Sequence, residues 1–286
     1  MDRFIRKDDF NYLKEKYPYI SFHLYHDITA GRLAQVRYLF GSEGYITVPH
    51  TYHISTIQKI GGLITYNGRF KKSYGSHCNI ISVNGYPDWN NYYKLEDNEF
   101  VTYDKKINGV CSLNKIYHTG KTGDIVYLRK NLFNSLSGIL KHSYGPVAYG
   151  GGNYQGPGGS PSSKESLVII NKYKFNLALE PMYHPMWSYD WVTERMWNCF
   201  RAKTIPVYFG GYNIEDHVPT DLFIDLRKYL VQVMPKITFD TIRLVEDLNN
   251  ISKDQYIDMT EKGYEWQKNN RLGNIEDIIA VLETLK

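Results

Sequence analysis

Several features that would narrow the function quickly are scarce in this sequence. The 286 residues include three cysteines, Cys78, Cys111 and Cys199, which form neither a CxxC pair nor a metal-binding spacing. An odd, scattered set of this kind favours a reducing compartment and argues against a disulfide framework. No apolar stretch approaches the roughly 18 residues that indicate a membrane helix, and the N-terminus has no apolar signal core. We therefore expect a cytoplasmic protein without a membrane span.

An excess of charge of one sign is also missing. The chain has 34 basic and 30 acidic residues, a formal net charge of +4, and no block of Lys and Arg stands out. A nucleic-acid partner is not expected, although an anionic nucleotide is compatible with this charge. The nine histidines lack metal-binding spacing. The glycine-rich segment 150–163 is no Walker loop, because Lys164 is followed by Glu165. We expect a flexible loop near a ligand there.

What the chain does have is the composition of a folded, aromatic-rich protein. Hydrophobic residues make up 42% and charged residues 22%, which is typical of a globular protein long enough for two domains. The 26 tyrosines offer flat apolar faces with a polar edge, which suits stacking on sugars. For any single tyrosine, a half-buried surface position is the commoner explanation.

The most informative stretch runs from Tyr173 to Gly211 and reads YKFNLALEPMYHPMWSYDWVTERMWNCFRAKTIPVYFGG. It begins with apolar and polar residues in alternation, which predicts a strand ending at Glu180. Asp190 can cap a following helix, and Val207 to Phe209 predict a short buried strand that stops at two glycines. This is a β-α-β unit. Its helix start, with Glu194 and Arg195, is a favourable place for a phosphate.

This stretch resembles the donor-binding motif of the family 10 glycosyltransferases, the α-1,3/1,4-fucosyltransferases, in its YKF, V-T-E and P-V-x-x-G elements. The resemblance extends upstream through KINGVCSLNKIYHTGKTGDIVYLRKNLFNSL, from Lys106 to Leu136, and more weakly through FGSEGYITVPHTY and LITYN. It covers residues 35 to 265 approximately and is strongest in the second half. The absence of a membrane anchor makes it similar to the bacterial or viral type of the family.

Three departures from the family pattern are visible in the same stretch. The usual Glu-Asn pair is Glu180 followed by Pro181, the loop 182–189 is longer, and the lysine of T-E-K is Arg195. An arginine keeps the positive charge and adds a planar fork that can bind a diphosphate in bidentate fashion. The class of the donor is therefore better supported than its identity.

The family resemblance implies a GT-B fold, with two Rossmann-like α/β domains facing across a cleft and a C-terminal helix returning to the first domain. Alternating strand and helix signals agree with mostly parallel sheets. We expect an acceptor-side domain at 1–104, compact or truncated because the usual first strand is missing, and a donor-binding domain at 105–265. A C-terminal helix is expected at 266–286. Within the second domain, apolar residues at helical spacing predict a helix from Leu128 to Leu140, followed by a strand at 146–149.

For catalysis, the resemblance implies three residues. Glu43, in FGSEG, matches the acceptor-side glutamate and is the expected general base. Arg129 and Arg195 match residues that contact the diphosphate, where positive charge offsets the negative charge of the leaving group. A solvated loop acid for Glu43 and a surface salt bridge for Arg129 are the plainer alternatives.

The resemblance also implies a set of donor-binding residues. Glu194 is expected to accept hydrogen bonds from ribose or sugar hydroxyls, and Glu180 to face the sugar or, nearly as well, to pair with a nearby Arg or Lys. The full set is Glu194, Glu180, Trp191, Tyr189, Asn114 and Lys115, with Lys106 and Ser112 matching the same donor-side loop. No bound metal is expected to be essential.

The resulting hypothesis is an inverting fucosyltransferase that moves fucose from GDP-fucose to a hydroxyl of an oligosaccharide or glycoconjugate, with an α-1,3-type linkage. One alternative is a GT-B enzyme that uses a different GDP-sugar, since Pro181 and Arg195 depart from the pattern. Another is an inactive carbohydrate-binding relative. The acceptor and the oligomeric state are not predicted.

Overall fold

The computed structural model divides the chain into two compact units. The first comprises Met1–Trp89, Pro185–Thr193 and Arg271–Lys286, and the second comprises Asn90–His184 and Glu194–Asn270. The residues that the structure describes are 15–17, 39–41, 62–65, 79–82, 94–113, 126–145, 153–156, 163–180, 183, 188, 192–233, 236–270, 279 and 283.

The first unit contains a parallel sheet of three strands, β1 (Leu39–Gly41), β2 (Gly62–Thr65) and β3 (Asn79–Ser82), in the order β1-β2-β3. The strand β2 includes the first three residues of the LITYN segment, which carries the weaker part of the family resemblance. In the same unit, the hydroxyl of buried Tyr17 donates to the carboxylate of Glu283 at 2.6 Å. A residue near the C-terminus is thereby attached to the first unit, in agreement with the predicted return of the chain.

The second unit is built on five parallel strands. They are β4 (Ile107–Leu113), β5 (Leu140–Tyr144), β6 (Tyr173–Leu179), β7 (Ile205–Phe209) and β8 (Ile224–Asp225), in the order β5-β4-β6-β7-β8. The first strand along the chain therefore lies between the second and the third. This is the order of a doubly wound α/β sheet, and it confirms the predicted fold class for this unit.

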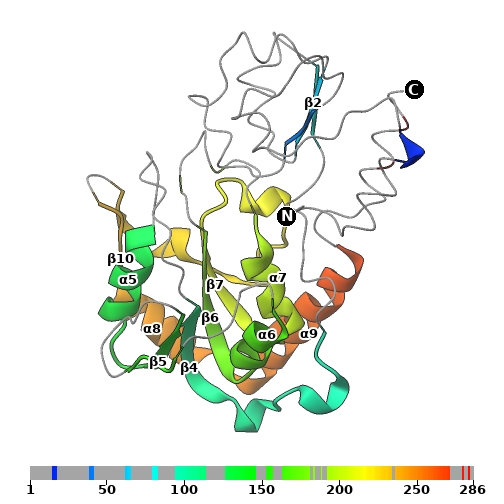
Figure 1. Cartoon of the computed structure of the whole chain (residues 1–286). Helices are drawn as coiled ribbons and strands as arrows, with labels where there is room; N and C mark the ends of the chain where they lie inside the picture. Colours follow the sequence, from blue (N-terminus) through cyan, green and yellow to red (C-terminus); the bar gives the residue numbers. More distant parts are fainter. Residues whose placement is uncertain are drawn as a thin grey trace. The chain divides into compact units, whose positions relative to one another are not determined.

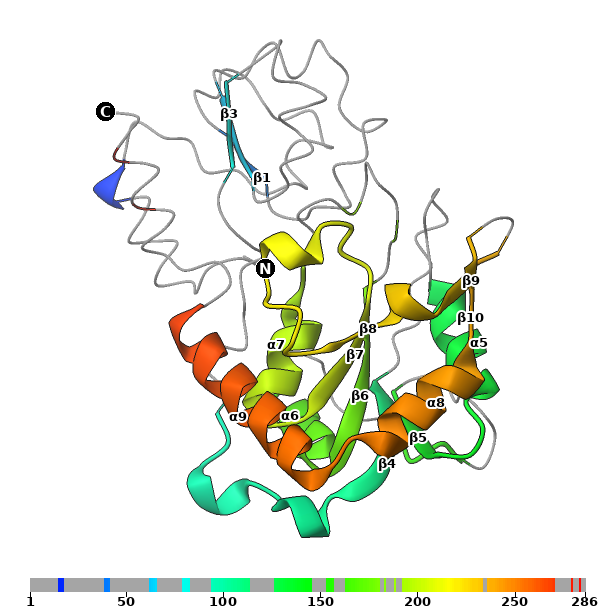
Figure 2. The same cartoon turned by 180° about the vertical axis from the view of Figure 1, so that it is seen from behind.

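Helices cover both faces of this sheet. Figures 1 and 2 show α5 (Val126–Ser135) and α8 (Thr241–Asn250) on one side, and α6 (Lys164–Asn171) and α7 (Glu194–Arg201) on the other. The helix α9 (Lys253–Asn269) runs beside α7 and is joined to it by aromatic contacts, among them Trp197 with Trp266 at 5.4 Å between ring centroids. Alternation of strands and helices on the two faces gives three layers.

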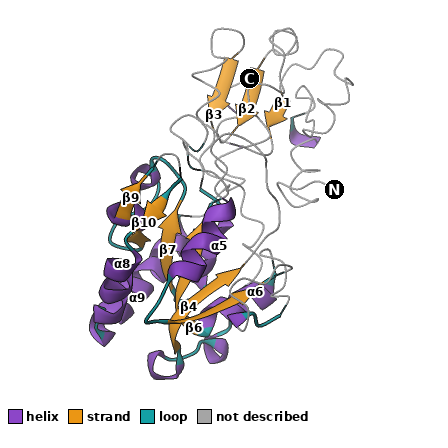
Figure 3. Ribbon diagram, turned by 90° about the vertical axis from the view of Figure 1, so that its left-hand side faces the viewer, coloured by secondary structure: helices purple, strands orange, loops and turns teal. Residues whose placement is uncertain are grey.

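The remaining elements of the second unit are short. The strands β9 (Leu230–Gln232) and β10 (Thr238–Phe239) pair antiparallel, and Figure 3 shows this ribbon beside α8. Four 3-10 turns complete the described part, η2 (Asp97–Glu99), η3 (Tyr103–Lys105), η5 (Ile214–Asp216) and η6 (Leu226–Tyr229).

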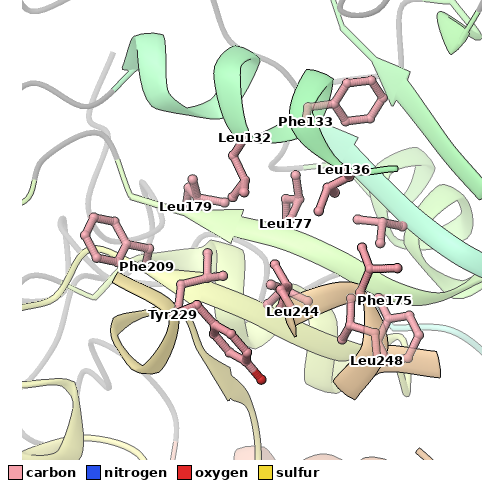
Figure 4. Close-up of a cluster of buried hydrophobic side chains, with 14 of the residues drawn as sticks. Leu132, Phe133, Leu136, Phe175, Leu177, Leu179, Phe209, Tyr229, Leu244 and Leu248 are labelled. Atoms are coloured by element: carbon pink, nitrogen blue, oxygen red, sulfur yellow. The ribbon is translucent and has the colours of Figure 1, made fainter. Parts of the chain in front are cut away.

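The main hydrophobic core lies between the sheet and the α5/α8 layer. Figure 4 shows leucines and phenylalanines from α5, β6, β7 and α8 meeting there, with Phe175 and Leu244 among them. A smaller cluster fills the other face around Leu167 and Ile170 of α6. Because both faces are covered, β6 is buried on both sides rather than on one, and its polar residue Asn176 is 3% exposed. The predicted strand is confirmed. The alternation of apolar and polar residues in its sequence had indicated only one buried face.

The predicted helix from Leu128 to Leu140 is too long. It ends at Ser135, and Leu140 begins β5. Gly138 lies between them with φ +81°, a conformation that stops a helix and suits glycine. The ammonium of Lys141 then donates to the carbonyls of Asn134, at 2.9 Å, and Leu136. The predicted strand 146–149 lies outside the described residues.

The two units divide at Trp89 and Asn90, ahead of the predicted boundary at residue 104. The intervening segment packs on the second unit through Asn171, the last residue of α6. Its side chain accepts from the amide of Val101 at 3.2 Å and donates to the carbonyl of Glu99 at 2.7 Å. These hydrogen bonds join residues about seventy positions apart, so the local composition of the segment could not indicate them.

Candidate functional site

The order of the strands marks one place on the second unit as a binding site. The connection from β4 leads outward to β5, and the chain then returns past β4 to β6, so the direction of winding changes between β4 and β6. Ligands of open α/β sheets bind outside the carboxyl ends of the strands at such a switch point. We call this place the switch-point edge, defined by the carboxyl ends of β4 at Leu113 and of β6 at Leu179.

Arg129 reaches the switch-point edge from the connection that follows β4. It lies in α5, its side chain is buried at 4% exposure, and its Nη2 donates to the carbonyl of Leu179 at 2.7 Å. That carbonyl belongs to the last residue of β6. The guanidinium predicted to contact a diphosphate is therefore fixed at the strand end where the topology places a ligand.

Arg195 reaches the same edge from the opposite layer. It is the second residue of α7, and its Nη1 donates to Oε2 of Glu180 at 3.0 Å. Glu180 directly follows Leu179 and is 0% exposed, whereas the Arg195 side chain is 17% exposed. The two arginines, which are far apart in the sequence, thus bind consecutive residues at one strand end. Their predicted roles toward a donor stay predictions.

Glu194 begins α7 and is 6% exposed. The first turn of a helix presents free N–H groups and the positive end of the helix dipole, which favours a carboxylate. The sequence prediction that Glu194 and Arg195 both lie in the first helical turn is confirmed. The helix begins at Glu194, so its N-cap position is Thr193, and the prediction that Asp190 caps it is wrong; Asp190 itself lies outside the described residues.

The turn after β7 is shaped by Glu180. Gly210 has φ +152°, and a Cβ atom on it would lie 2.2 Å from Cβ of Glu180, a distance that no real contact has. The amide of Glu180 also donates to the carbonyl of Phe209 at 2.8 Å, and the amide of Gly211 donates to the hydroxyl of Tyr208 at 2.9 Å. Gly210, the first of the two glycines that the sequence suggested as a strand end, is therefore required by the packing of a site residue.

An ion-pair cluster beside β8, the outermost strand of the sheet, which β7 separates from β6, was missed by the sequence analysis. Nε of Arg227 donates to both carboxylate oxygens of Asp225, at 3.0 and 2.9 Å, and Nη2 lies 2.8 Å from Oε2 of Glu215. The hydrogen bond from Arg227 lowers the pKa of Glu215. Nearby, the ring centroids of Tyr183 and Phe209 are 4.3 Å apart. The only sequence signal for this cluster was the alternation of apolar and charged residues in FIDLR, from Phe223 to Arg227.

Beneath the site, a buried chain of polar groups crosses from β4 to α7. The thiol of Cys111 donates to Oδ1 of Asn176, Nδ2 of Asn176 donates to the sulfur of Cys199, and that thiol donates to the carbonyl of Arg195, each at 3.2 Å. Burial raises the pKa of both thiols, that of Cys199 to about 12. Both are therefore neutral at pH 7 and act as weak donors, which ties the first turn of α7 to the centre of the sheet.

Five of the predicted site residues are not among those that the structure describes. The expected base Glu43 and the donor-side residues Asn114, Lys115, Tyr189 and Trp191 lie outside the described residues.

Lys106 lies at the amino end of β4, opposite the switch-point edge, where its ammonium donates to the carbonyl of Asn171 at 2.6 Å. Its expected place in a donor-side loop is therefore wrong. The sequence match was local, whereas the strand direction decides which edge a residue reaches. Ser112 is near the carboxyl end of the same strand and is buried.

Among the described residues, no group of three or more His, Cys, Asp or Glu side chains could hold a metal ion. In the same part of the chain, none of the helices combines the length and apolar character of a membrane span. The expectations that no metal is essential and that the protein is cytoplasmic stay predictions.

Comparison with known proteins gives a family. The model of glycosyltransferase family 10 (fucosyltransferase), C-term, matches residues 127–277. Over 106 residues the chain is 30% identical to 4-galactosyl-N-acetylglucosaminide 3-alpha-L-fucosyltransferase 9 of Homo sapiens. This match covers 36% of the chain and 26% of that protein, so it spans about a quarter of the relative's length.

Among solved structures, the chain is similar to an alpha1,3-fucosyltransferase with GDP, at a TM-score of 0.56 and 13% identity, covering 88% of this chain and 78% of that one. The alpha1,3-fucosyltransferase with GDP-fucose gives a TM-score of 0.53 at 15% identity, with the same coverage. At these identities the likeness concerns the fold alone. It agrees with the predicted GT-B class; the predicted cleft between domains stays a prediction.

Proposed function

Because the chain belongs to glycosyltransferase family 10, the fucosyltransferases, we propose that it transfers fucose from GDP-fucose to a hydroxyl group of a glycan acceptor. The observation that carries the proposal is the meeting of Arg129 and Arg195 at consecutive residues of the β6 end. Two guanidinium groups at the switch point of a doubly wound sheet are suited to a diphosphate.

The chemistry follows from charge. When the bond from fucose to the β-phosphate breaks, negative charge builds on the leaving GDP, and fixed positive groups stabilise it. Arg129 is held by the Leu179 carbonyl and Arg195 by Glu180, so neither has to reorganise during the reaction. Fixed groups of this kind stabilise a transition state more effectively than mobile ones.

We assign the general base to Glu43, which would take the proton from the acceptor hydroxyl as oxygen attacks the anomeric carbon. In this proposal the displacement is direct, inverts the anomeric carbon and forms an α-linkage, of the α-1,3 type. The carbon–oxygen bond to GDP breaks as the new one forms, and the proton ends on the carboxylate. This role rests on the family resemblance of FGSEG, since Glu43 lies outside the described residues.

Two measurements test the proposal. Purified protein is incubated with a panel of GDP-sugars, with and without oligosaccharides, and released GDP and glycan product are followed. We expect GDP-fucose to be the preferred donor and a fucosylated oligosaccharide to form. A preference for GDP-mannose over GDP-fucose would instead support the alternative of a changed donor, for which Arg195 in place of lysine is the motivating residue.

The second alternative, an inactive carbohydrate-binding relative, differs in its response to nucleotide. A ligand at a hundred times its Kd stabilises the folded state by about 2.7 kcal/mol. We expect GDP to raise the melting temperature accordingly. An unchanged melting temperature with GDP, together with a raised one with oligosaccharides, would favour the binding protein.

A further inference from the structure

We infer that Glu180 is a positioning residue whose buried carboxylate orients the Arg195 guanidinium and offsets part of its charge, and so sets how tightly the site holds and releases the diphosphate of GDP. The inference rests on the proposed function. It replaces the sugar contact expected of Glu180 with a role that acts through Arg195.

Burial separates the two partners of this ion pair. Glu180 is 0% exposed, whereas 17% of the Arg195 side chain is exposed. The arginine is therefore the member of the pair that a ligand arriving from solvent meets. Glu180 is also enclosed from behind, because Gly210 approaches so closely that a Cβ atom there would lie 2.2 Å from that of Glu180. A carboxylate enclosed in this way influences a ligand through its partner.

The geometry of the pair fixes a direction as well as a charge. A guanidinium carries its five N–H donors in one rigid plane, so the 3.0 Å hydrogen bond from Nη1 to Glu180 sets the orientation of the whole group. The backbone of Arg195 is held independently, since its carbonyl accepts from the thiol of Cys199. With both ends held, the fork is presented to the switch-point edge in one orientation.

The carboxylate has a second effect, on affinity. Its negative charge lies within hydrogen-bonding distance of the guanidinium, so it weakens the attraction of Arg195 for any other anion. A transferase has to release GDP after each cycle, and product release limits the rate of many enzymes. An arginine without this counter-charge would bind GDP more tightly and release it more slowly.

The test compares two substitutions at one position. Glu180→Gln keeps the size and one acceptor oxygen but removes the charge, so the inhibition constant of GDP is expected to fall about three- to thirtyfold, with a lower kcat. Glu180→Ala also removes the support, so KM for GDP-fucose is expected to rise. Melting curves with and without GDP report folding separately from catalysis.

Glu215→Gln is the matched control. Glu215 also pairs with an arginine, Arg227 at 2.8 Å, near the carboxyl ends of the strands, but its side chain is 50% exposed. Removing this charge is expected to leave the GDP inhibition constant unchanged. An equal decrease in the GDP inhibition constant of Glu215→Gln would show that the loss of any carboxylate strengthens GDP binding through net charge alone. That result would overturn the role given to Glu180.

Arg195→Gln keeps the inference testable if the Glu180 variants do not fold. It removes the guanidinium that pairs with Glu180 and would face the diphosphate, and GDP is expected to bind at least about tenfold more weakly. A GDP constant within about twofold of the natural chain in either Glu180→Gln or Arg195→Gln would overturn the inference while fucosyl transfer still stands. If the natural chain neither binds GDP nor transfers fucose, the proposed function itself fails.

Discussion

The two edges of the second unit's sheet both bury charge, yet they surround it differently. At the amino edge, Lys106 is 8% exposed and donates to neutral oxygens, the Asn171 carbonyl at 2.6 Å and the Thr204 hydroxyl at 3.4 Å. At the carboxyl edge, Arg195 meets a carboxylate and stays partly exposed. A buried ammonium that donates to neutral oxygens serves packing, whereas a partly exposed arginine backed by a carboxylate suits an anionic ligand.

The largest expected effect comes from removing a guanidinium at the carboxyl edge. For Arg129→Ala we expect kcat/KM for GDP-fucose to fall by about 100- to 1000-fold, because a fixed positive group facing the leaving diphosphate is lost. Arg243→Ala is the control, since that arginine is exposed and lies over the ring of Tyr229 at 5.6 Å. Steady-state kinetics would decide, and comparable activity in both variants would contradict the role of Arg129.

The next prediction compares two glycines, Gly210 beside Glu180 and Gly138 between α5 and β5. Gly210→Ala introduces a Cβ that collides with Glu180, and we expect a loss of about 1–3 kcal/mol in unfolding free energy together with a clear loss of kcat/KM. Gly138→Ala is also strained, at φ +81°, but its Cβ meets only ordinary contact with Val245 at 3.7 Å. It should lose stability and keep its kinetic constants. Denaturation and kinetics on both variants test the contrast.

At the amino edge, the charge of Lys106 is expected to affect the pH dependence of the unfolding free energy rather than catalysis. Burial lowers the pKa of Lys106 to about 7, below the value of about 10.4 in an unfolded chain. Between these values the folded state binds fewer protons, so this group makes stability rise with pH, by up to about 1.4 kcal/mol per unit. The buried thiols of Cys111 and Cys199 act in the opposite sense above about pH 8.5, because their folded pKa values are raised.

Lys106→Met isolates that contribution, because the variant keeps both thiols. We expect the difference in unfolding free energy between the natural chain and the variant to change between pH 7 and 9 in favour of the natural chain. The activity per folded molecule should be unchanged. A difference that is flat with pH would contradict the buried charge, and a loss of kcat would contradict the assignment of Lys106 to packing.

The smallest effect is expected at an exposed ion pair near the amino edge. Lys203 donates to both carboxylate oxygens of Glu261, at 2.7 and 2.8 Å, and the Glu261 side chain is 50% exposed. Such pairs contribute little, so Glu261→Gln should change the unfolding free energy by at most about 0.5 kcal/mol. Thermal denaturation measures this change, and a larger loss would show that α9 depends on the pair.

The sequence was sufficient for the elements whose signals are local. The strand β6, the first turn of α7 and the end of β7 at Gly210 were predicted because alternation, helical spacing and glycine signals lie within one run. The end of α5 was missed, because the apolar spacing continues through Ile139 although Gly138 and Lys141 stop the helix.

Contacts between distant segments could not be predicted in the same way. The role of Glu180 depends on the approach of Gly210 and Arg195, and the ion pairs of Arg227 with Asp225 and Glu215 likewise depend on the fold. The edge of the sheet that Lys106 reaches depends on the strand order. The sequence supplies candidate side chains for a site, but their partners follow from how strands are ordered in the sheet.

The most direct measurement of the central claim is a crystal structure of the chain with GDP-fucose or GDP bound. We predict that the diphosphate lies at the carboxyl end of β6, with oxygens within hydrogen-bonding distance of both Arg129 and Arg195, and with Glu180 still bound to Arg195. A nucleotide bound elsewhere, or touching neither guanidinium, would contradict the account.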